Sequence, residues 1–233
     1  MKDDETFRTA DSGSSAKAAS KMRIRPVDAA SLIIIDRTAR GFRVLMGKRH
    51  SRHVFMPDTY VFPGGRRERH DSRAKISLDL PDDVAHQLRR RTPASSPRSH
   101  ARALAVAAIR ETREETGLRA NQYDEAGTFD LSCLRFLARA VTPPGQVRRF
   151  DARFFACFVE ESGIDPDAAE DSDELTDLRW VELPHIERLP VPRITRAVLE
   201  DLERALSGDR RLRRVESVPF YHMLHGVERR DLL

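Results

Sequence analysis

The sequence has few cysteines and no long apolar run. Its 233 residues include two cysteines. Cys133 and Cys157 both lie in apolar segments, so we expect buried thiols in a reducing compartment and no disulfide framework. The longest apolar run, Ala103 to Ile109, is far shorter than the roughly 20 residues that a membrane-spanning helix needs. We therefore expect a soluble, cytoplasmic protein with no membrane partner.

The first twenty residues also lack an apolar stretch. They contain acidic residues, Ser and Gly, which cannot form a secretory signal and are typical of segments that do not fold. Residues 1–22 are therefore predicted to be a disordered leader. A chain of 233 residues is closer to one domain with additions than to two, so we expect residues 23–233 to form a single domain.

Neither sign of charge is in large excess. Charged residues make up 33% of the chain, but 41 Lys and Arg oppose 37 Asp and Glu, and the net charge is +4. The basic run Arg89 to Arg91 lies near Pro and Ser, without interleaved aromatic side chains that could stack on bases. Phosphate contacts alone would give only salt-sensitive, sequence-blind association, so we do not expect nucleic acid as a partner.

Strand-like runs alternate with turn residues along the chain. Ser31–Ile35 and Phe42–Met46 flank a turn-like stretch and predict an opening hairpin. A third short strand, Tyr60–Phe62, ends at Pro63-Gly64-Gly65, where two glycines allow the backbone to approach another group closely. Later strands are predicted over residues 126–130, 135–142, 152–160 and 177–183.

Helical patterns are predicted in three places. The Ala-rich segment Ala101–Thr116 precedes Gly117, a residue suited to the positive φ that often follows a helix. Residues 194–206 carry apolar side chains at fourfold spacing, and we expect residues 193–233 to be a C-terminal helix and a tail. The polar, Arg-rich residues 66–99 predict an insertion with a short helix around residues 82–88. Because this insertion leaves directly from the glycine loop, a lid over that loop is one hypothesis for its function.

Three carboxylates share one face of the helix predicted over Ala101–Thr116. Glu111, Glu114 and Glu115 fall within an arc of roughly 100°. Like charges at this spacing repel, so either an ordinary surface ion pair, such as Arg110 with Glu114, or a bound cation must compensate. The glycine loop adds backbone carbonyls, and an all-oxygen donor set suits a hard ion such as Mg²⁺ or Mn²⁺.

The motif FPGG at Phe62–Gly65, followed by AAIRETREETGL at Ala107–Leu118, resembles the signature of Nudix hydrolases. The resemblance implies an α/β fold, an α/β/α sandwich with a mixed sheet, for the domain at residues 23–233. It also implies metal-dependent hydrolysis of a diphosphate that joins a nucleoside to another group.

By position, the resemblance implies that Glu111, Glu114 and Glu115 are the metal ligands, that Arg110 orients a neighbouring glutamate and that Gly64 offers its carbonyl. Two departures accompany these assignments. Counting back the family's interval from Arg110 reaches residues 96 and 102, which are Ser and Arg instead of Gly and Glu, so the loop-side glutamate is unassigned. Residue 112 is Thr where the family has an aliphatic side chain, which we interpret as a packing change.

Two longer segments, VLMGKRHSRHVFMPDTYVFPGG and ARAVTPPGQVRRFDARFFACFV, are similar to the branch of peroxisomal coenzyme A diphosphatases and their bacterial relatives. This similarity implies coenzyme A or acyl-coenzyme A as the first-choice substrate. ADP-ribose, NADH and dinucleoside polyphosphates are alternatives, and so is a Nudix-fold module that senses a nucleotide without turnover. The C-terminal Asp-Leu-Leu is not a peroxisomal address.

Further residues are candidates for substrate contacts and for the general base. Arg49 and Arg149 could grip phosphate oxygens through the guanidinium fork, although simple surface charge explains them too. Phe62 and Gly65 complete the predicted substrate-binding residues. Glu174, in an acidic loop, is our candidate for activating water, against the alternative of a solvated loop. We assign His222 and His225 a structural role, and a homodimer is one assembly compatible with the sequence.

Overall fold

The computed structural model describes residues 24–50, 56–92, 97–119, 127–213 and 215–233, so the predicted leader lies outside the described residues. Nine strands of the described chain form one large sheet in the order β11-β10-β7-β8-β1-β2-β3, with β4 paired to β1 and β9 paired to β2. The strands are β1 Val27–Thr38, β2 Gly41–Arg49, β3 Tyr60–Val61, β4 Gly64–Arg66, β7 Arg135–Val141, β8 Phe150–Phe158, β9 Leu175–Glu182, β10 Pro219–Leu224 and β11 Val227–Leu232. β1 with β8 and β7 with β10 are parallel, and the other pairs are antiparallel. The predicted mixed sheet and its opening hairpin are confirmed.

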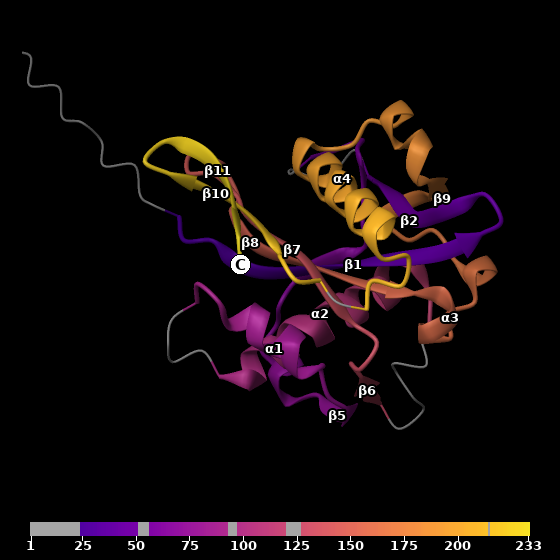
Figure 1. The fold of residues 1–233 in the computed structure, drawn as a ribbon, viewed down its shortest axis with the longest axis horizontal. Helices are drawn as coiled ribbons and strands as arrows, with labels where there is room; N and C mark the ends of the chain where they lie inside the picture. Colours follow the sequence, from indigo (N-terminus) through magenta and orange to yellow (C-terminus); the bar gives the residue numbers. More distant parts are fainter. Residues whose placement is uncertain (1–23, 51–55, 93–96, 120–126, 214) are drawn as a thin grey trace, which may run out of the picture.

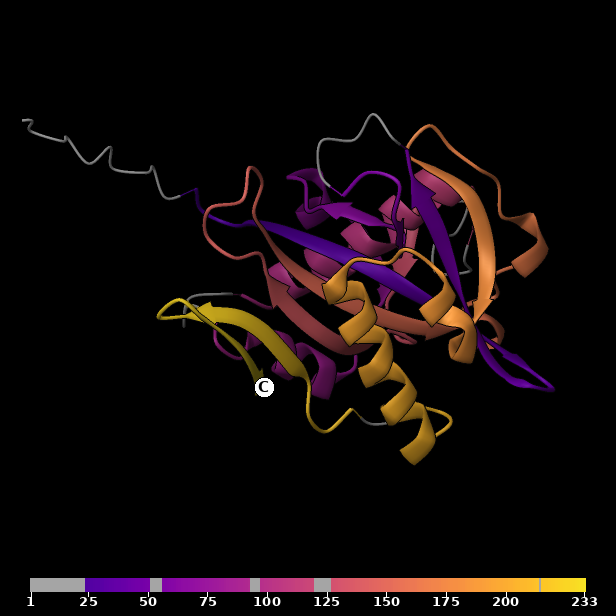
Figure 2. The ribbon, with the colours of Figure 1, turned by 90° about the horizontal axis from the view of Figure 1, so that it is seen from above.

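Helices cover both faces of this sheet (Figure 1). The longer elements are α1 Asp82–Arg89, α2 Arg98–Thr116 and α4 Arg193–Gly208; the shorter ones are α3 Val159–Ser162, η1 His70–Arg73, η2 Pro166–Ala168 and η3 Leu183–Arg188, with a small parallel sheet of β5 Lys75–Leu78 and β6 Thr128–Asp130. Seen from above, α4 lies across the sheet (Figure 2). No helix among the described residues is long and apolar enough to span a membrane.

The side chains of β1 alternate between two cores because successive residues of a strand point to opposite faces. Leu32 and Ile34 pack with the apolar side chains of α1 and α2. Ile33 and Ile35 pack with those of α4. All four are fully buried, so β1 is a central strand with a helix layer on each side.

Helix α2 packs closely on the sheet through alanines. Its buried face includes Ala101, Ala105 and Ala108, whose small side chains allow the helix to approach the strands. The helix begins earlier than predicted, directly after Pro97, and it ends at Gly117 with φ 70°. The amide of Gly117 donates to the Arg113 carbonyl, so the predicted helix end is confirmed.

The C-terminal region contains a hairpin that our sequence interpretation did not predict. β10 and β11 are joined at His225 and Gly226, which have φ 48° and 79°. Positive φ at both central residues is typical of the tight turns that join twisted strands. Arg230 Nη2 on β11 lies 2.7 Å from Asp201 Oδ1 on α4, so the hairpin is tied to the helix layer.

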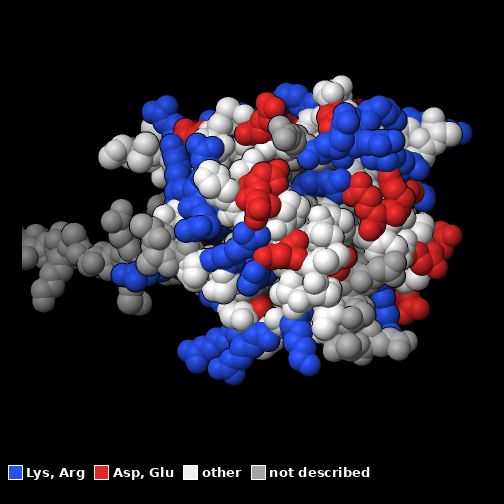
Figure 3. All heavy atoms as spheres, turned by 60° about the horizontal axis from the view of Figure 1, so that its bottom comes forward, with Lys and Arg blue, Asp and Glu red and all other residues white. Residues whose placement is uncertain are grey.

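The described part of the predicted insertion packs beside α2. Val84 and Leu88 of α1 are buried in the core on the α2 side of the sheet. Asp79 forms ion pairs with Arg98 and Arg102 in the first turns of α2. On the face formed by these elements, acidic side chains lie among the basic ones (Figure 3), as the mixed charge of the sequence predicts.

Candidate active site

The glycine loop and the end of α2 meet at short range. The Gly64 amide donates to Glu115 Oε2 over 2.7 Å, and Gly64 pairs with Ser31 of β1. A Cβ atom on Gly64 would lie 2.4 Å from the Ala30 carbonyl oxygen, and one on Gly65 would lie 2.4 Å from the carboxyl carbon of Glu111. Gly64, whose φ is 157°, therefore requires glycine because a side chain would meet the backbone of β1, whereas a side chain at Gly65 would displace the Glu111 carboxylate.

One guanidinium group lies among three carboxylates. Arg110 Nε is 2.9 Å from Asp71 Oδ1, and its Nη1 is 2.9 Å from Glu111 Oε1 and 2.8 Å from Glu114 Oε2. Its Nη2 donates to the Arg66 carbonyl of the glycine-loop segment over 3.0 Å. Arg110 thus holds the loop and two of the helix glutamates together, and the negative charges outnumber the positive one.

Asp71 is a site residue that our sequence interpretation missed. Its side chain is buried, with 2% of the residue exposed, and it accepts the amide of Glu68 over 2.6 Å as well as Arg110. The motif spacing could have identified it. Counting six residues forward from Gly65, instead of backward from Arg110 across the insertion, reaches Asp71. The loop-side carboxylate is therefore present as an aspartate.

Burial and like charge act together on two of the glutamates. Desolvation by burial raises the pKa of Glu115 to about 8; the Gly64 amide and the charge of Arg49 oppose the rise, and the charges of Glu111 and Glu174 add to it. Burial also raises the pKa of Glu111 against the effect of Arg110. Both side chains lie near the C-terminal end of α2, where the helix dipole further disfavours anions. The site therefore favours a nearby cation.

The acidic loop before β9 approaches this end of α2. The charge of the exposed Glu174 acts on both Glu111 and Glu115, and its carbonyl accepts the His50 amide over 3.3 Å. The Glu170 amide donates to the Thr116 carbonyl over 2.9 Å. The structure thus brings the predicted general base near the helix glutamates.

The other candidates divide into two groups. Arg49 lies near enough to lower the pKa of Glu115. Phe62 is buried on the α4 side of the sheet, edge-on to Phe154 with ring centroids 6.3 Å apart. Arg149, directly before β8, donates from its guanidinium to the carbonyls of Thr142 and Ile24. None of these contacts of Phe62 or Arg149 reaches the glutamates, and the roles of both residues in binding stay predictions.

Two interpretations of single residues fit their surroundings. The buried Thr112 donates its hydroxyl to the Ala108 carbonyl over 2.8 Å, so its polar atom is satisfied within the helix where an aliphatic residue was expected. His222 stacks on Phe220 with centroids 4.4 Å apart, and its Nε2 lies 2.9 Å from Asp231 Oδ2. These contacts are consistent with a structural histidine.

The donor set of the site suits a hard divalent cation. Glu111, Glu114, Glu115 and the glycine-loop backbone offer only oxygen ligands, which Mg²⁺ and Mn²⁺ prefer. Among the described residues, no group of three His, Cys, Asp or Glu side chains is already arranged to hold a metal ion. Arg110 instead contacts two of these carboxylates. An added cation would relieve the repulsion that helps to raise the pKa of Glu115.

Residues 90–202 match the family model of the NUDIX domain. This segment, just under half of the chain, is similar to the Nudix domain. The matched residues include α2 with its glutamates, whereas the glycine loop precedes them, on the other side of the predicted insertion. A comparison with curated proteins finds no match.

Solved structures extend the likeness beyond the matched residues. A NUDIX hydrolase from Alicyclobacillus acidocaldarius is 28% identical, with a TM-score of 0.54, over 78% of this chain and 96% of that one. The NUDIX domain of Shewanella oneidensis NrtR, solved with ADP ribose, has the same fold at 13% identity, with a TM-score of 0.50, over 82% of this chain and 95% of that one. The domain match and the Alicyclobacillus structure together support a Nudix hydrolase of the pyrophosphatase class.

Proposed function

We propose that this Nudix protein is a divalent-metal-dependent pyrophosphohydrolase that cleaves the diphosphate of a nucleoside diphosphate derivative. The observation that carries the proposal is the excess of carboxylates around Arg110, with the pKa of the buried Glu115 raised to about 8. A purely structural ion-pair cluster gains nothing from excess charge of one sign, whereas a cation-dependent site needs it.

In this proposal Glu111, Glu114 and Glu115 hold Mg²⁺ or Mn²⁺ together with the Gly64 carbonyl. The bound ion would neutralise diphosphate oxygens and lower the pKa of an attacking water. Arg110 keeps Glu111 oriented, because its guanidinium is itself fixed by Asp71. Gly65 gives the Glu111 carboxylate the room that it occupies.

Glu174 is our candidate for the group that accepts the proton of the attacking water. It is exposed and lies close enough for its charge to affect the half-buried Glu111 and the buried Glu115, so a water between them is within its reach. Arg49 is the favoured phosphate-binding residue because its charge acts at Glu115. Full kcat in Glu174→Gln would reject the base, and an unchanged KM in Arg49→Gln would reject the phosphate contact.

The first-choice substrate is coenzyme A or acyl-coenzyme A, and this choice rests on the sequence resemblance alone. ADP-ribose is the leading alternative, since the NrtR domain of the same fold was solved with ADP ribose. NADH and dinucleoside polyphosphates complete the substrate class. We expect the active unit to be the single domain at residues 23–233, in the cytoplasm and, as one compatible assembly, as a homodimer.

The alternative is a module that binds a nucleotide without turnover, because one fold supports several functions. The complete set of glutamates at the end of α2 argues for the hydrolase. A sensing module would need a nucleotide pocket but not a surplus of carboxylates.

The experiment is hydrolysis of coenzyme A, acetyl-coenzyme A, ADP-ribose, NADH and diadenosine polyphosphates with Mg²⁺ or Mn²⁺. We expect turnover of at least one compound, its loss in Glu114→Gln, and wild-type rates in Glu203→Gln, which alters an exposed glutamate of α4. Binding of a panel member without any cleavage would favour the sensing module. Equal turnover in wild type and Glu114→Gln would contradict the assigned site.

A further inference from the structure

The two cysteines lie on the α2 side of the sheet, and neither is among the residues proposed for hydrolysis. Cys133 lies just before β7, and Cys157 lies in β8. The antiparallel pairing places Arg135 opposite Ala156, so extending that register by one residue brings Leu134 beside Cys157. Both cysteines pack in the same apolar cluster, and Cys133, next to Leu134, is a neighbour of Cys157 in it. Neighbouring cysteines on adjacent chain segments can reach disulfide geometry after a small adjustment.

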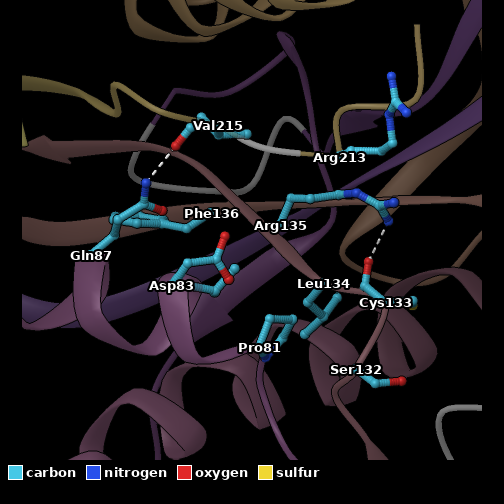
Figure 4. Close-up of a pocket in the computed structure, with 11 residues that line it drawn as sticks. Pro81, Asp83, Gln87, Ser132, Cys133, Leu134, Arg135, Phe136, Arg213 and Val215 are labelled. Carbon is cyan, nitrogen blue, oxygen red and sulfur yellow. Dashed lines mark hydrogen bonds between the residues drawn. The ribbon is translucent and has the colours of Figure 1, made fainter. Parts of the chain in front are cut away.

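The two thiols differ in their access to solvent. Cys157 is completely buried, whereas Cys133 is half-buried and lines a cavity of about 120 Å³ (Figure 4). The cavity lies between α1, the loop before β7 and the segment around Val215. A reagent that enters this cavity therefore reaches Cys133 before Cys157.

Access to solvent sets the order in which the two thiols react. Arg135 and Arg213 also line the cavity. Arg135 Nη1 donates to the backbone carbonyl of Cys133 over 2.6 Å (Figure 4), and the same guanidinium is paired with Glu161. The neighbouring Cys133 and burial raise the pKa of the Cys157 thiol. Cys133 is therefore the thiol that an oxidant in the cavity meets first.

We propose that Cys133 is an oxidation site for a small hydroperoxide and that Cys157 then closes a disulfide with it. In the first step the Cys133 thiolate attacks one peroxide oxygen, the O–O bond breaks, and the products are a sulfenic acid and water or an alcohol. In the second step the Cys157 sulfur attacks the Cys133 sulfur, the S–O bond breaks, and the hydroxide leaves as water with the Cys157 proton. The peroxide is reduced by two electrons, which the two sulfurs supply.

The cavity gives a small oxidant access to Cys133. About 120 Å³ admits hydrogen peroxide or a short alkyl hydroperoxide. A direct reaction at Cys157 is excluded by its complete burial. The reaction therefore depends on the order Cys133 first and Cys157 second, and it is independent of the proposed hydrolase activity.

The experiment treats the full-length chain with hydrogen peroxide under native conditions and measures its intact mass before and after dithiothreitol. We expect the wild type to lose the mass of two hydrogen atoms reversibly. Cys157→Ser should instead gain one oxygen atom, at Cys133, in a form trapped by dimedone, and Cys133→Ser should not change.

Several results would overturn the proposal. In the wild type these are no change in mass, or a gain of two or three oxygen atoms at Cys133 without a disulfide. Oxidation of Cys133→Ser at Cys157 would reverse the assigned order. Should a serine variant fail to fold, a tryptic map of the oxidised wild type decides the matter, because it must contain a peptide that joins Cys133 to Cys157 and disappears on reduction.

Discussion

The two ends of α2 place carboxylates in opposite electrostatic surroundings. Near the start of the helix, Asp79 accepts two guanidinium groups, with Arg98 Nε 2.9 Å and Arg102 Nη2 2.5 Å from its Oδ2. Hydrogen bonding to Arg102 lowers its pKa to about 2. At the other end, the single guanidinium of Arg110 serves three carboxylates, and the pKa of Glu115 rises to about 8.

The difference separates a structural ion pair from a candidate functional site. At the start of α2 two guanidinium groups, of Arg98 and Arg102, match two carboxylates, of Asp79 and Asp82, so no further cation is required. At the end of α2 the charges do not balance, and burial makes the imbalance costly. Carboxylates on one helix can therefore form either structural ion pairs or a candidate cation site, and the local ratio of cations to carboxylates distinguishes the two.

The largest expected effect is on turnover at the unbalanced end. Glu111→Gln should lower kcat by at least about a hundredfold, because a lost metal ligand removes several kcal/mol of transition-state stabilisation. Arg102→Gln, at the balanced end, should change kcat less than about threefold. Steady-state kinetics on the best substrate of the panel would measure kcat for both variants. Similar losses of kcat in the two would contradict the proposed difference between the two ends of α2.

A smaller loss should follow from crowding Glu111 without removing it. In Gly65→Ala the new Cβ would lie 2.4 Å from the Glu111 carboxyl carbon, so the carboxylate must move, and we expect kcat to fall about tenfold. The control is Gly208→Ala, where nothing lies within 4 Å of the new Cβ. Wild-type kcat in Gly65→Ala would show that the close approach has no functional consequence.

The free energy of unfolding should depend on pH through Glu115. Its folded-state pKa of about 8 lies above the ordinary value of 4.5, so the folded protein holds a proton that the unfolded chain has lost. Stability without metal should therefore fall as pH rises from about 4.5 to about 8, by up to roughly 1.4 kcal/mol per pKa unit.

Urea unfolding at several pH values measures this effect. Glu115→Gln should flatten the dependence over that window, and Mg²⁺ should restore stability to the wild type at the alkaline end. A wild-type stability that rises with pH over the same window would contradict the charge imbalance at this end of α2.

The smallest effect is expected at the balanced end. Arg102→Ala leaves Asp79 with Arg98, and both side chains of the lost pair are partly exposed, so the free energy of unfolding should fall by about 0.5–1 kcal/mol. Chemical denaturation would measure it. A loss several times larger would mean that the insertion depends on this ion pair.

The candidate site could be predicted from the sequence where its geometry is local. The spacing of Glu111, Glu114 and Glu115 places them on one face of the helix, which needs no knowledge of the fold. Gly64 and Gly65 mark the loop that contacts these glutamates. Asp71 was missed because the insertion separates it from Arg110, and the interval was counted from the wrong end.

The other features that the sequence did not predict depend on pairing between strands that are far apart in the chain. The hairpin of β10 and β11 joins the sheet beside β7, and the order of strands along the sheet is not visible in local patterns. The contact between Cys133 and Cys157 depends on the pairing of β7 with β8. The local sequence pattern predicted only that each cysteine lies among apolar residues.

The most direct test of the account is a Mn²⁺ titration followed by electron paramagnetic resonance, with wild type, Glu111→Gln and Arg102→Gln compared at pH 8. The account predicts that wild type and Arg102→Gln bind Mn²⁺ with equal affinity and that Glu111→Gln binds it at least tenfold more weakly. Equal affinity in all three proteins, or no binding to the wild type, would contradict the claim that the carboxylates at the end of α2 form a cation site.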